Sequence, residues 1–489
     1  MPLSATLALG QTSYNLLEVL DVDQKVVASI TSRASTQTLA AVKRGGEISG
    51  INIQSDGTTS LNVTDRSSEL FYSETPDALI NSNINLLANS NLSAFDLGNG
   101  DNRFNAARDL TNSQVMASGG NDNIRIGGSA DGSSVYTGDG DDRFTANRGS
   151  DGLWLNMGAG ADTILFLGTL TTGLELTPIS ENPVYERVSS VELGTGDDSA
   201  TFLGGVQGDV NTLGNILNLI DLGFGDDTVV FGANSNSNKF FLDTGSGSDM
   251  VTLGRTTTNA YIDLGWDNGF LGYMSPDNSD TTVYRGQGDY VILGVGSTLA
   301  NSTITSEQSW DELRLAGTVT DTTLDLGWGY SEIDVDGVVA FSDSTFWELA
   351  GGNDKLTFNE FSDISLLGDD GYGYFDLGSG SDSLSLLGTG FGGWSSRIEF
   401  DLGDSFWDFY TDDSILEDGD NDTVNVGLNS SYSGILISNF GEEDVLIIGE
   451  SEYDFDDIFN SGNNFDDDLS TFLASGNTIR SSYYGAPPF

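Results

Sequence analysis

Short runs of alternating apolar and polar residues recur along most of the chain. The runs DMVTLG (249–254) and AYIDLG (260–265) are representative, with apolar residues at every second position and a glycine at the end. Alternation with a period of two predicts a β-strand with one buried face. A Gly-rich turn on one side and a polar turn such as RTTTN (255–259) on the other separate these strands, so the pattern predicts coils with two strands each.

The pattern returns about every 20 residues. The first position of the Gly-rich turn falls at 98, 118, 138 and 158, and further along at 245, 265, 286, 306 and 327. One coil cannot bury its apolar face alone, so coils must stack. We therefore expect an all-β fold, a right-handed parallel β-solenoid of the β-roll or β-helix kind, with coils of about 20 residues.

The Gly-rich turn follows the pattern Gly-x-Gly-x-Asp, as in LIDLGFGDDTVVFG, FLDTGSGSDMVTLG and YFDLGSGSDSLSLLG. Glycine permits positive φ, so the backbone can curl tightly and aim its carbonyl oxygens inward, and the aspartate adds a carboxylate. Stacked turns then form a cage of hard oxygen ligands, which suits Ca²⁺ because calcium accepts six to eight oxygens in loose geometry. The predicted metal ligands are Asn102, Asp122, Asp142, Asp162, Asp198, Asp227, Asp249, Asp354, Asp382 and Asp422.

Composition agrees with a need for cations. The 489 residues include 74 acidic and 18 basic side chains, a formal net charge of −56, and residues 1–90 hold only 9 of the acids. This charge argues against nucleic acid and anionic membranes as partners, and no apolar run is long enough to enter and cross a bilayer. Cysteine and histidine are absent, which leaves oxygen ligands only and removes the usual nucleophiles and bases.

The turns resemble the nonapeptide repeats of the RTX family, Gly-Gly-x-Gly-x-Asp followed by strand residues, from about residue 95 to 427. The resemblance implies a calcium-loaded β-roll that folds outside the cell after type I secretion, directed by an uncleaved C-terminal signal. The N-terminus, MPLSATLALGQTSYNLLEVL, lacks the basic head of a cleaved signal peptide, which is consistent with that route. RTX rolls usually carry a calcium turn on both edges, whereas each coil here keeps it on one edge.

Three regions are expected. Residues 1–94 lack the turn and form an N-terminal cap, an attachment region or ion-free coils; residues 95–433 form the solenoid. Residues 434–489 form a C-terminal cap and a possible secretion signal, since GILISNFGEEDVLIIGESEYDFDDI (434–458) resembles the segment that closes RTX rolls.

The motif decays at GWDNG (265–269), GQGDY (286–290), SEQSWDE (306–312) and GWGYSE (327–332), and again at GDSFWD (403–408). We therefore expect one row of ions with a gap from about 265 to 345 and an empty opposite edge. Six of the seven tryptophans lie mostly at or beside degenerate turns. We expect their rings to fill the space that an ion occupies in an intact turn. The alternative is that the rings form a ladder that binds sugar. They are Trp266, Trp310, Trp328, Trp347, Trp394 and Trp407.

The segment 418–422 resembles the start of an EF-hand loop, because it places aspartates at 418, 420 and 422. Position six of that loop is Thr423, where glycine is needed, and position twelve is Asn429, where glutamate is needed. An EF-hand is therefore not expected.

Three classes of function remain. The favoured one is a secreted, non-catalytic calcium-binding structural protein of a surface layer, matrix or adhesive coat, which self-associates or binds a cell-surface or polysaccharide partner. The second is a virion structural protein such as a tail-fibre or decoration subunit. The third is a polysaccharide lyase or epimerase on a β-helix, for which a cluster of Arg and Tyr on one exposed sheet would be the discriminating feature.

Overall fold

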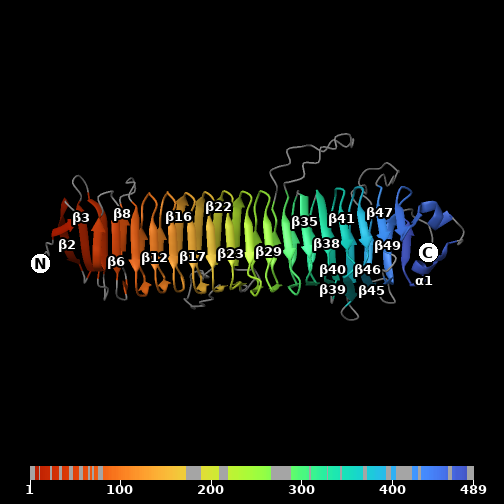
Figure 1. The fold of residues 1–489 in the computed structure, drawn as a ribbon, viewed down its shortest axis with the longest axis horizontal. Coiled ribbons are helices and arrows are strands. Elements are labelled where there is room, and N and C mark those ends of the chain that lie inside the picture. Colours follow the sequence, from red (N-terminus) through yellow and green to blue (C-terminus); the bar gives the residue numbers. More distant parts are fainter. Residues whose placement is uncertain are drawn as a thin grey trace, which may run out of the picture. The chain divides into compact units, whose positions relative to one another are not determined.

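The computed structural model describes the backbone of strands β1 to β8 and, beyond them, a set of segments with their side chains. These segments are 81–171, 189–208, 218–265, 288–307, 310–327, 329–341, 344–366, 372–391, 398–403, 421–427, 431–460 and 465–481. The chain divides into two compact units, Met1–Asp243 and Thr244–Phe489. Each unit is a parallel β-solenoid, so the predicted fold class is confirmed (Figure 1).

Most coils contribute strands to three faces. Face 1 precedes the Gly-rich turn, face 2 follows it, and face 3 returns the chain to face 1. Two strands per coil were predicted, and this is wrong: the segment RTTTN holds a third strand, β30 (Thr256–Thr258). Its central residue Thr257 is fully buried, because β-branched threonine favours extended backbone and a short polar side chain fits a narrow corner.

The first unit begins with antiparallel strands, β1 (Thr6–Leu9), β2 (Thr12–Val22), β3 (Lys25–Thr31) and β4 (Thr36–Val42). Strand β4 pairs antiparallel with β8 (Phe71–Glu74), and β5 (Ile48–Ile53) pairs antiparallel with β6 (Thr59–Val63). Parallel pairing starts at β6 and β8, which join β9 and β11. The solenoid was expected to begin at residue 95. The parallel coils begin before that residue.

In the first unit the coils repeat regularly. Face 1 contains β8, β11 (Ala94–Asp96), β14 (Gln114–Met116), β16 (Ser134–Asp139), β19 (Trp154–Ala159), β22 (Ser189–Thr195), β25 (Asn218–Phe224) and β28 (Phe241–Asp243). Face 2 contains β6, β9 (Ser82–Leu86), β12 (Arg103–Ala106), β15 (Asn123–Ile126), β17 (Arg143–Ala146), β20 (Thr163–Phe166), β23 (Ser199–Phe202) and β26 (Thr228–Phe231). Face 3 contains β7 (Ser67–Ser68), β10 (Ser90–Asn91), β13 (Leu110–Thr111), β18 (Ser150–Asp151), β21 (Leu170–Thr171), β24 (Val206–Gln207) and β27 (Asn236–Asn238).

The second unit repeats this arrangement. Face 1 contains β31 (Tyr261–Asp263), β34 (Thr303–Thr305), β37 (Thr323–Asp325), β40 (Ser344–Glu348), β43 (Tyr372–Asp376), β46 (Ile398–Asp401), β49 (Ile435–Phe440) and β52 (Thr478–Ser481). Face 2 contains β29 (Met250–Leu253), β32 (Tyr290–Leu293), β35 (Trp310–Leu315), β38 (Tyr330–Val335), β41 (Lys355–Phe358), β44 (Ser383–Leu386), β47 (Thr423–Val426) and β50 (Val445–Ile448). Face 3 contains β30, β33 (Thr298–Ala300), β36 (Thr318–Thr320), β39 (Val338–Phe341), β42 (Asp363–Leu366), β45 (Thr389–Phe391) and β48 (Ser431–Ser433).

A small closing structure ends the second unit. Strand β51 (Ser451–Tyr453) folds back antiparallel on β50 and leads into the π-helical turn η3 (Asp456–Asn460) and the helix α1 (Asp467–Ala474). The side chain of Asp466 caps this helix by accepting hydrogen bonds from the N–H groups of Asp468 and Leu469. No helix in the described part of the chain is long and apolar enough to cross a membrane.

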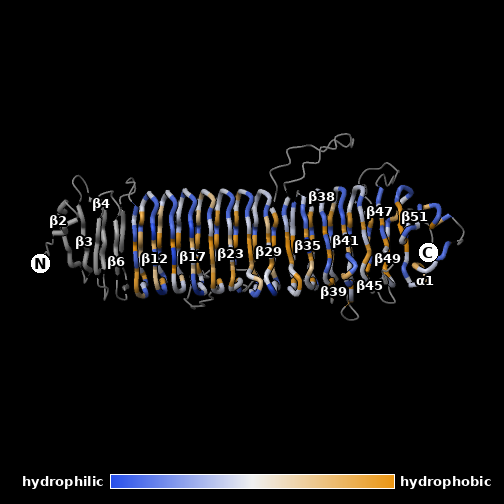
Figure 2. The backbone as a smooth tube through the Cα atoms, in the orientation of Figure 1, coloured by the Kyte–Doolittle hydropathy of each residue, from blue (hydrophilic) through white to orange (hydrophobic). Residues whose placement is uncertain are grey.

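Alternation of buried and outward positions along most strands from β9 onward builds the core, and hydrophobic residues recur along these strands (Figure 2). In β17, Phe144 and Ala146 are buried while Arg143 is exposed. Phenylalanine rings from successive coils then stack, with centroids 5.3 Å apart for Phe166 and Phe202 and 5.5 Å apart for Phe202 and Phe231. Each buried ring contributes about 1.5–3 kcal/mol of hydrophobic stabilisation, so the stack holds neighbouring coils in register.

Candidate functional site

The predicted ligands lie where the Gly-rich turn meets face 2. All ten residues are buried, with 0 to 2% of their surface exposed. Each one directly precedes a face 2 strand, as Asp142 precedes β17 and Asp382 precedes β44. The turns therefore line one edge within each unit, as the sequence predicts.

The aspartates form hydrogen-bonded rows, which we call the aspartate ladders. The backbone N–H of Asp142 donates to Oδ1 of Asp162 at 2.7 Å, and the N–H of Asp162 donates to Oδ1 of Asp198 at 2.6 Å. In the second unit Asp354, Asp382 and Asp422 repeat the pattern. A buried backbone N–H needs an acceptor, and the carboxylate of the next coil supplies it.

The ladders contain members that the sequence analysis missed. Asp289, Asp311 and Asp444 occupy the same register, and the N–H of Asp249 donates to Oδ1 of Asp289 at 2.8 Å. Asp289 and Asp311 are fully buried. The row of carboxylates therefore continues through GQGDY and SEQSWDE, and Ser331 takes the place at GWGYSE. The gap in the row of ions from 265 to 345 stays a prediction.

A signal for these positions was present in the strands and not in the turns. Asp289, Asp311 and Asp444 each stand two residues before the first of two alternating apolar residues, in DYVIL, DELRL and DVLII. The glycines change number from turn to turn, whereas this strand pattern does not. Ser82 occupies the same register in the first unit, where its N–H donates to Oδ1 of Asn102 at 2.8 Å.

The second carboxylate oxygen distinguishes the aspartates from Asn102. In Asp122, Asp142, Asp162, Asp198 and Asp354, Oδ2 is buried and has no hydrogen-bond partner among the described residues. The equivalent atom of Asn102 is Nδ2, which donates to the carbonyl oxygen of Gly98, the first glycine of its own turn, at 3.2 Å. An ionised carboxylate cannot donate such a bond, so each buried Oδ2 requires a proton or a cation to satisfy it.

Burial raises the pKa of the ladder carboxyls. The pKa of Asp122 rises to about 8 because the group is desolvated, and the nearby charge of Asp142 adds to the shift. Desolvation likewise raises the pKa of Asp162 to about 7 and that of Asp354 to about 9, again with contributions from neighbouring ladder aspartates. Stacked carboxylates in a low-dielectric edge resist ionisation unless a positive charge joins them.

The glycines bring the turns of adjacent coils into contact. Gly160 has φ of +138°, and a Cβ built on it would lie 2.1 Å from the carbonyl oxygen of Gly140 in the preceding coil. Carbonyl oxygens of the turns thus point along the stack into the space between coils. No three acidic side chains in the described part gather closely enough to hold a metal ion by themselves, so an ion would need these carbonyl oxygens as well.

The tryptophans that the structure describes differ from one another. Trp347 is fully buried in the core behind face 1 and donates from Nε1 to the carbonyl oxygen of Thr322 at 2.9 Å, so the expectation of a turn filler is wrong there. Trp310 lies half-buried beside the turn and packs against Tyr330, with ring centroids 4.8 Å apart. Trp266, Trp328, Trp394 and Trp407 lie outside the described residues.

No protein-family model matches the chain, and no curated protein matches its sequence.

Proposed function

We propose that the protein is a calcium-binding structural protein whose aspartate ladders hold the ions. The observation that carries this proposal is the buried Oδ2 without a partner in five ladder aspartates, set beside Asn102, which fills the same place with an amide. Calcium is favoured over a softer metal because only oxygen ligands are available and calcium accepts them in loose geometry.

The ladder aspartates would hold the ion through Oδ2, and carbonyl oxygens of the Gly-rich turns would complete the set. The cation would supply the positive charge that a row of ionised carboxylates lacks. Oδ1 would keep its hydrogen bond to the preceding coil, so the backbone pairing and the ion site support each other.

The role we propose is extracellular and non-catalytic: a component of a surface layer, matrix or adhesive coat. Support for the location comes from the resemblance of the turns to secreted RTX repeats and from the charge of −56, which calcium outside the cell would offset. Support for a structural role comes from the repetition itself, since each coil offers the same backbone and the same buried groups.

The test measures folding against free calcium. The full chain, stripped of metal by dialysis against a chelator, is followed by circular dichroism while calcium or magnesium is added. We expect calcium to raise the β signal and the melting temperature, with a stabilisation that grows with the logarithm of its concentration, about 2.7 kcal/mol at a hundred times Kd. A stripped sample with the same β spectrum and the same melting temperature as the calcium-loaded one would contradict the proposal.

A further inference from the structure

Three arginines form a basic patch on face 2 of the first unit. Arg103 on β12 and Arg143 on β17 share one outward row with Asn123 between them, and Arg125 on β15 lies two residues further along the intervening strand. All three arginines are exposed. From the spacing of β-strands, Arg103 and Arg143 stand roughly 10 Å apart with Arg125 between them.

Amide side chains surround the arginines on the same face. Asn105 donates to Oδ1 of Asn85 at 3.4 Å, and Asn85 donates to Oδ1 of Asn83 at 3.2 Å. No outward position of β9, β12, β15 or β17 holds an aspartate or a glutamate.

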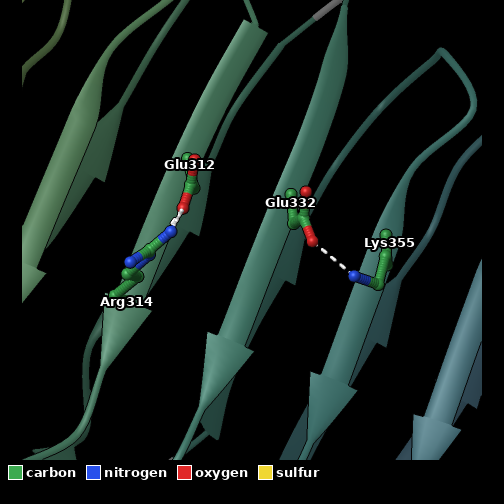
Figure 3. A network of polar contacts seen from close by, with 4 residues as sticks. All are labelled: Glu312, Arg314, Glu332 and Lys355. Carbon is green, nitrogen blue, oxygen red and sulfur yellow. Dashed lines mark hydrogen bonds and ion pairs between the residues drawn. The ribbon is translucent and has the colours of Figure 1, made fainter.

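Basic residues on face 2 of the second unit behave differently (Figure 3). Arg314 on β35 forms an ion pair with Glu312, and Lys355 on β41 forms one with Glu332. By contrast, the guanidinium groups of Arg103, Arg125 and Arg143 make no ion pair or hydrogen bond within the described part of the chain. Their charge is therefore available to a partner.

The surroundings of the patch define its borders. Arg108 and Arg148, both exposed, extend it into the turns that follow β12 and β17. On the opposite side, the exposed Asp101 and Asp141 accept backbone hydrogen bonds of 3.0 Å from the next coil, from Asn121 and Ala161. At physiological salt the Debye length is about 8 Å, so a ligand on the patch responds to these nearby groups and little to the net charge of the whole chain.

We propose that this patch binds an extended acidic polysaccharide. Guanidinium groups suit carboxylates because they donate paired hydrogen bonds in a planar fork, and the asparagines suit sugar hydroxyls because an amide both donates and accepts. A nucleic acid duplex fits less well. Its phosphates would extend beyond the three arginines of the patch and the two in the adjoining turns, and would meet the acidic residues Asp101 and Asp141 at the border.

The experiment uses the full chain in millimolar calcium, with folding of every variant verified by circular dichroism. The proposal does not depend on bound calcium, so folding and binding are measured separately. Hyaluronan, which carries a carboxylate on alternate sugars, and dextran, which is neutral, are immobilised as probes for biolayer interferometry. We expect binding to hyaluronan and none to dextran.

Two triple variants remove the same number of positive charges. Arg103→Gln, Arg125→Gln and Arg143→Gln together should weaken hyaluronan binding about tenfold or more. The matched control uses Arg255, which is exposed in the turn between β29 and β30, with the two paired residues of face 2. Arg255→Gln, Arg314→Gln and Lys355→Gln together should change the binding less than about threefold. Equal losses in both variants, or no binding by the unmodified chain, would overturn the proposal. Self-association in sedimentation velocity that the first variant alone abolishes would also overturn it, in favour of a second copy as the partner.

Discussion

The backbone N–H of Asp122 donates a hydrogen bond of 2.7 Å to Oδ1 of Asp142, the equivalent residue one coil further along. One oxygen of each carboxylate thus maintains the fold, while the other is buried without a partner. Because the two oxygens have separate roles, substitutions can separate the backbone role from the role of charge.

Asp142→Asn should stabilise the metal-free protein and weaken calcium binding. Asparagine keeps Oδ1 as the acceptor for Asp122, and its amide can donate as Asn102 does. We expect a gain of about 1–2 kcal/mol in the free energy of unfolding without calcium, measured by urea denaturation. Asp142→Ala should destabilise the protein with and without the ion. Asp141→Asn, an exposed neighbour, is the control for charge alone and should change little.

The metal-free protein should lose stability as pH rises from about 4 to about 8. Burial raises the pKa of Asp122 to about 8 and that of Asp162 to about 7, above the ordinary value of 3.8 for an aspartate carboxyl. The folded state therefore binds more protons in this interval, its stabilisation is complete below pH 3.8, and it is lost as pH passes the raised values.

Melting temperatures of stripped protein across this pH range test the prediction. The net charge of the whole chain also rises with pH, so Asp122→Asn with Asp162→Asn isolates the ladder and should flatten the slope. An unchanged slope in this variant would assign the effect to general repulsion instead.

Asp311→Ala should weaken calcium-dependent folding as strongly as Asp249→Ala. Both residues are fully buried and both stand in the ladder register of the second unit. The free energy of unfolding in calcium should fall by about 2–4 kcal/mol for each. A negligible effect of Asp311→Ala beside a large effect of Asp249→Ala would support the predicted gap in the row of ions.

Gly160→Ala should destabilise the calcium-loaded protein by about 3 kcal/mol or more. The new Cβ would lie 2.1 Å from the carbonyl oxygen of Gly140, so the two coils would have to separate. Gly296→Ala is the matched control, because Gly296 also has positive φ, +76°, but a Cβ there meets nothing within 4 Å. Its cost should be about 1 kcal/mol, and equal costs at both sites would contradict the close approach of the turns.

Phe202→Ala should reduce the free energy of unfolding by about 3–5 kcal/mol. The ring is fully buried and stacks between Phe166 and Phe231. Phe224, which is 60% exposed, is the control, and Phe224→Ala should change stability by less than about 1 kcal/mol. Chemical denaturation in calcium measures both.

The sequence by itself determined the repeat, the strands of faces 1 and 2, and the positions of ten ladder residues. These features are local: alternation such as DMVTLG and the turn Gly-x-Gly-x-Asp are complete within one coil. Even a decayed coil could have been recognised from its strand, since Asp311 precedes ELRL as Asp249 precedes MVTL.

Only the tertiary structure decided what the residues meet in the neighbouring coils. It placed a third strand in RTTTN, gave Oδ1 of Asp142 a backbone donor from another coil, and brought Arg103, Arg125 and Arg143 together, while Arg314 and Lys355 found acidic partners. Except for the ion pair between Arg314 and Glu312 within β35, these relationships join residues about 20 or more positions apart. They depend on the register of stacking, which arises from the summed packing of buried side chains across all coils and is not encoded in any single turn.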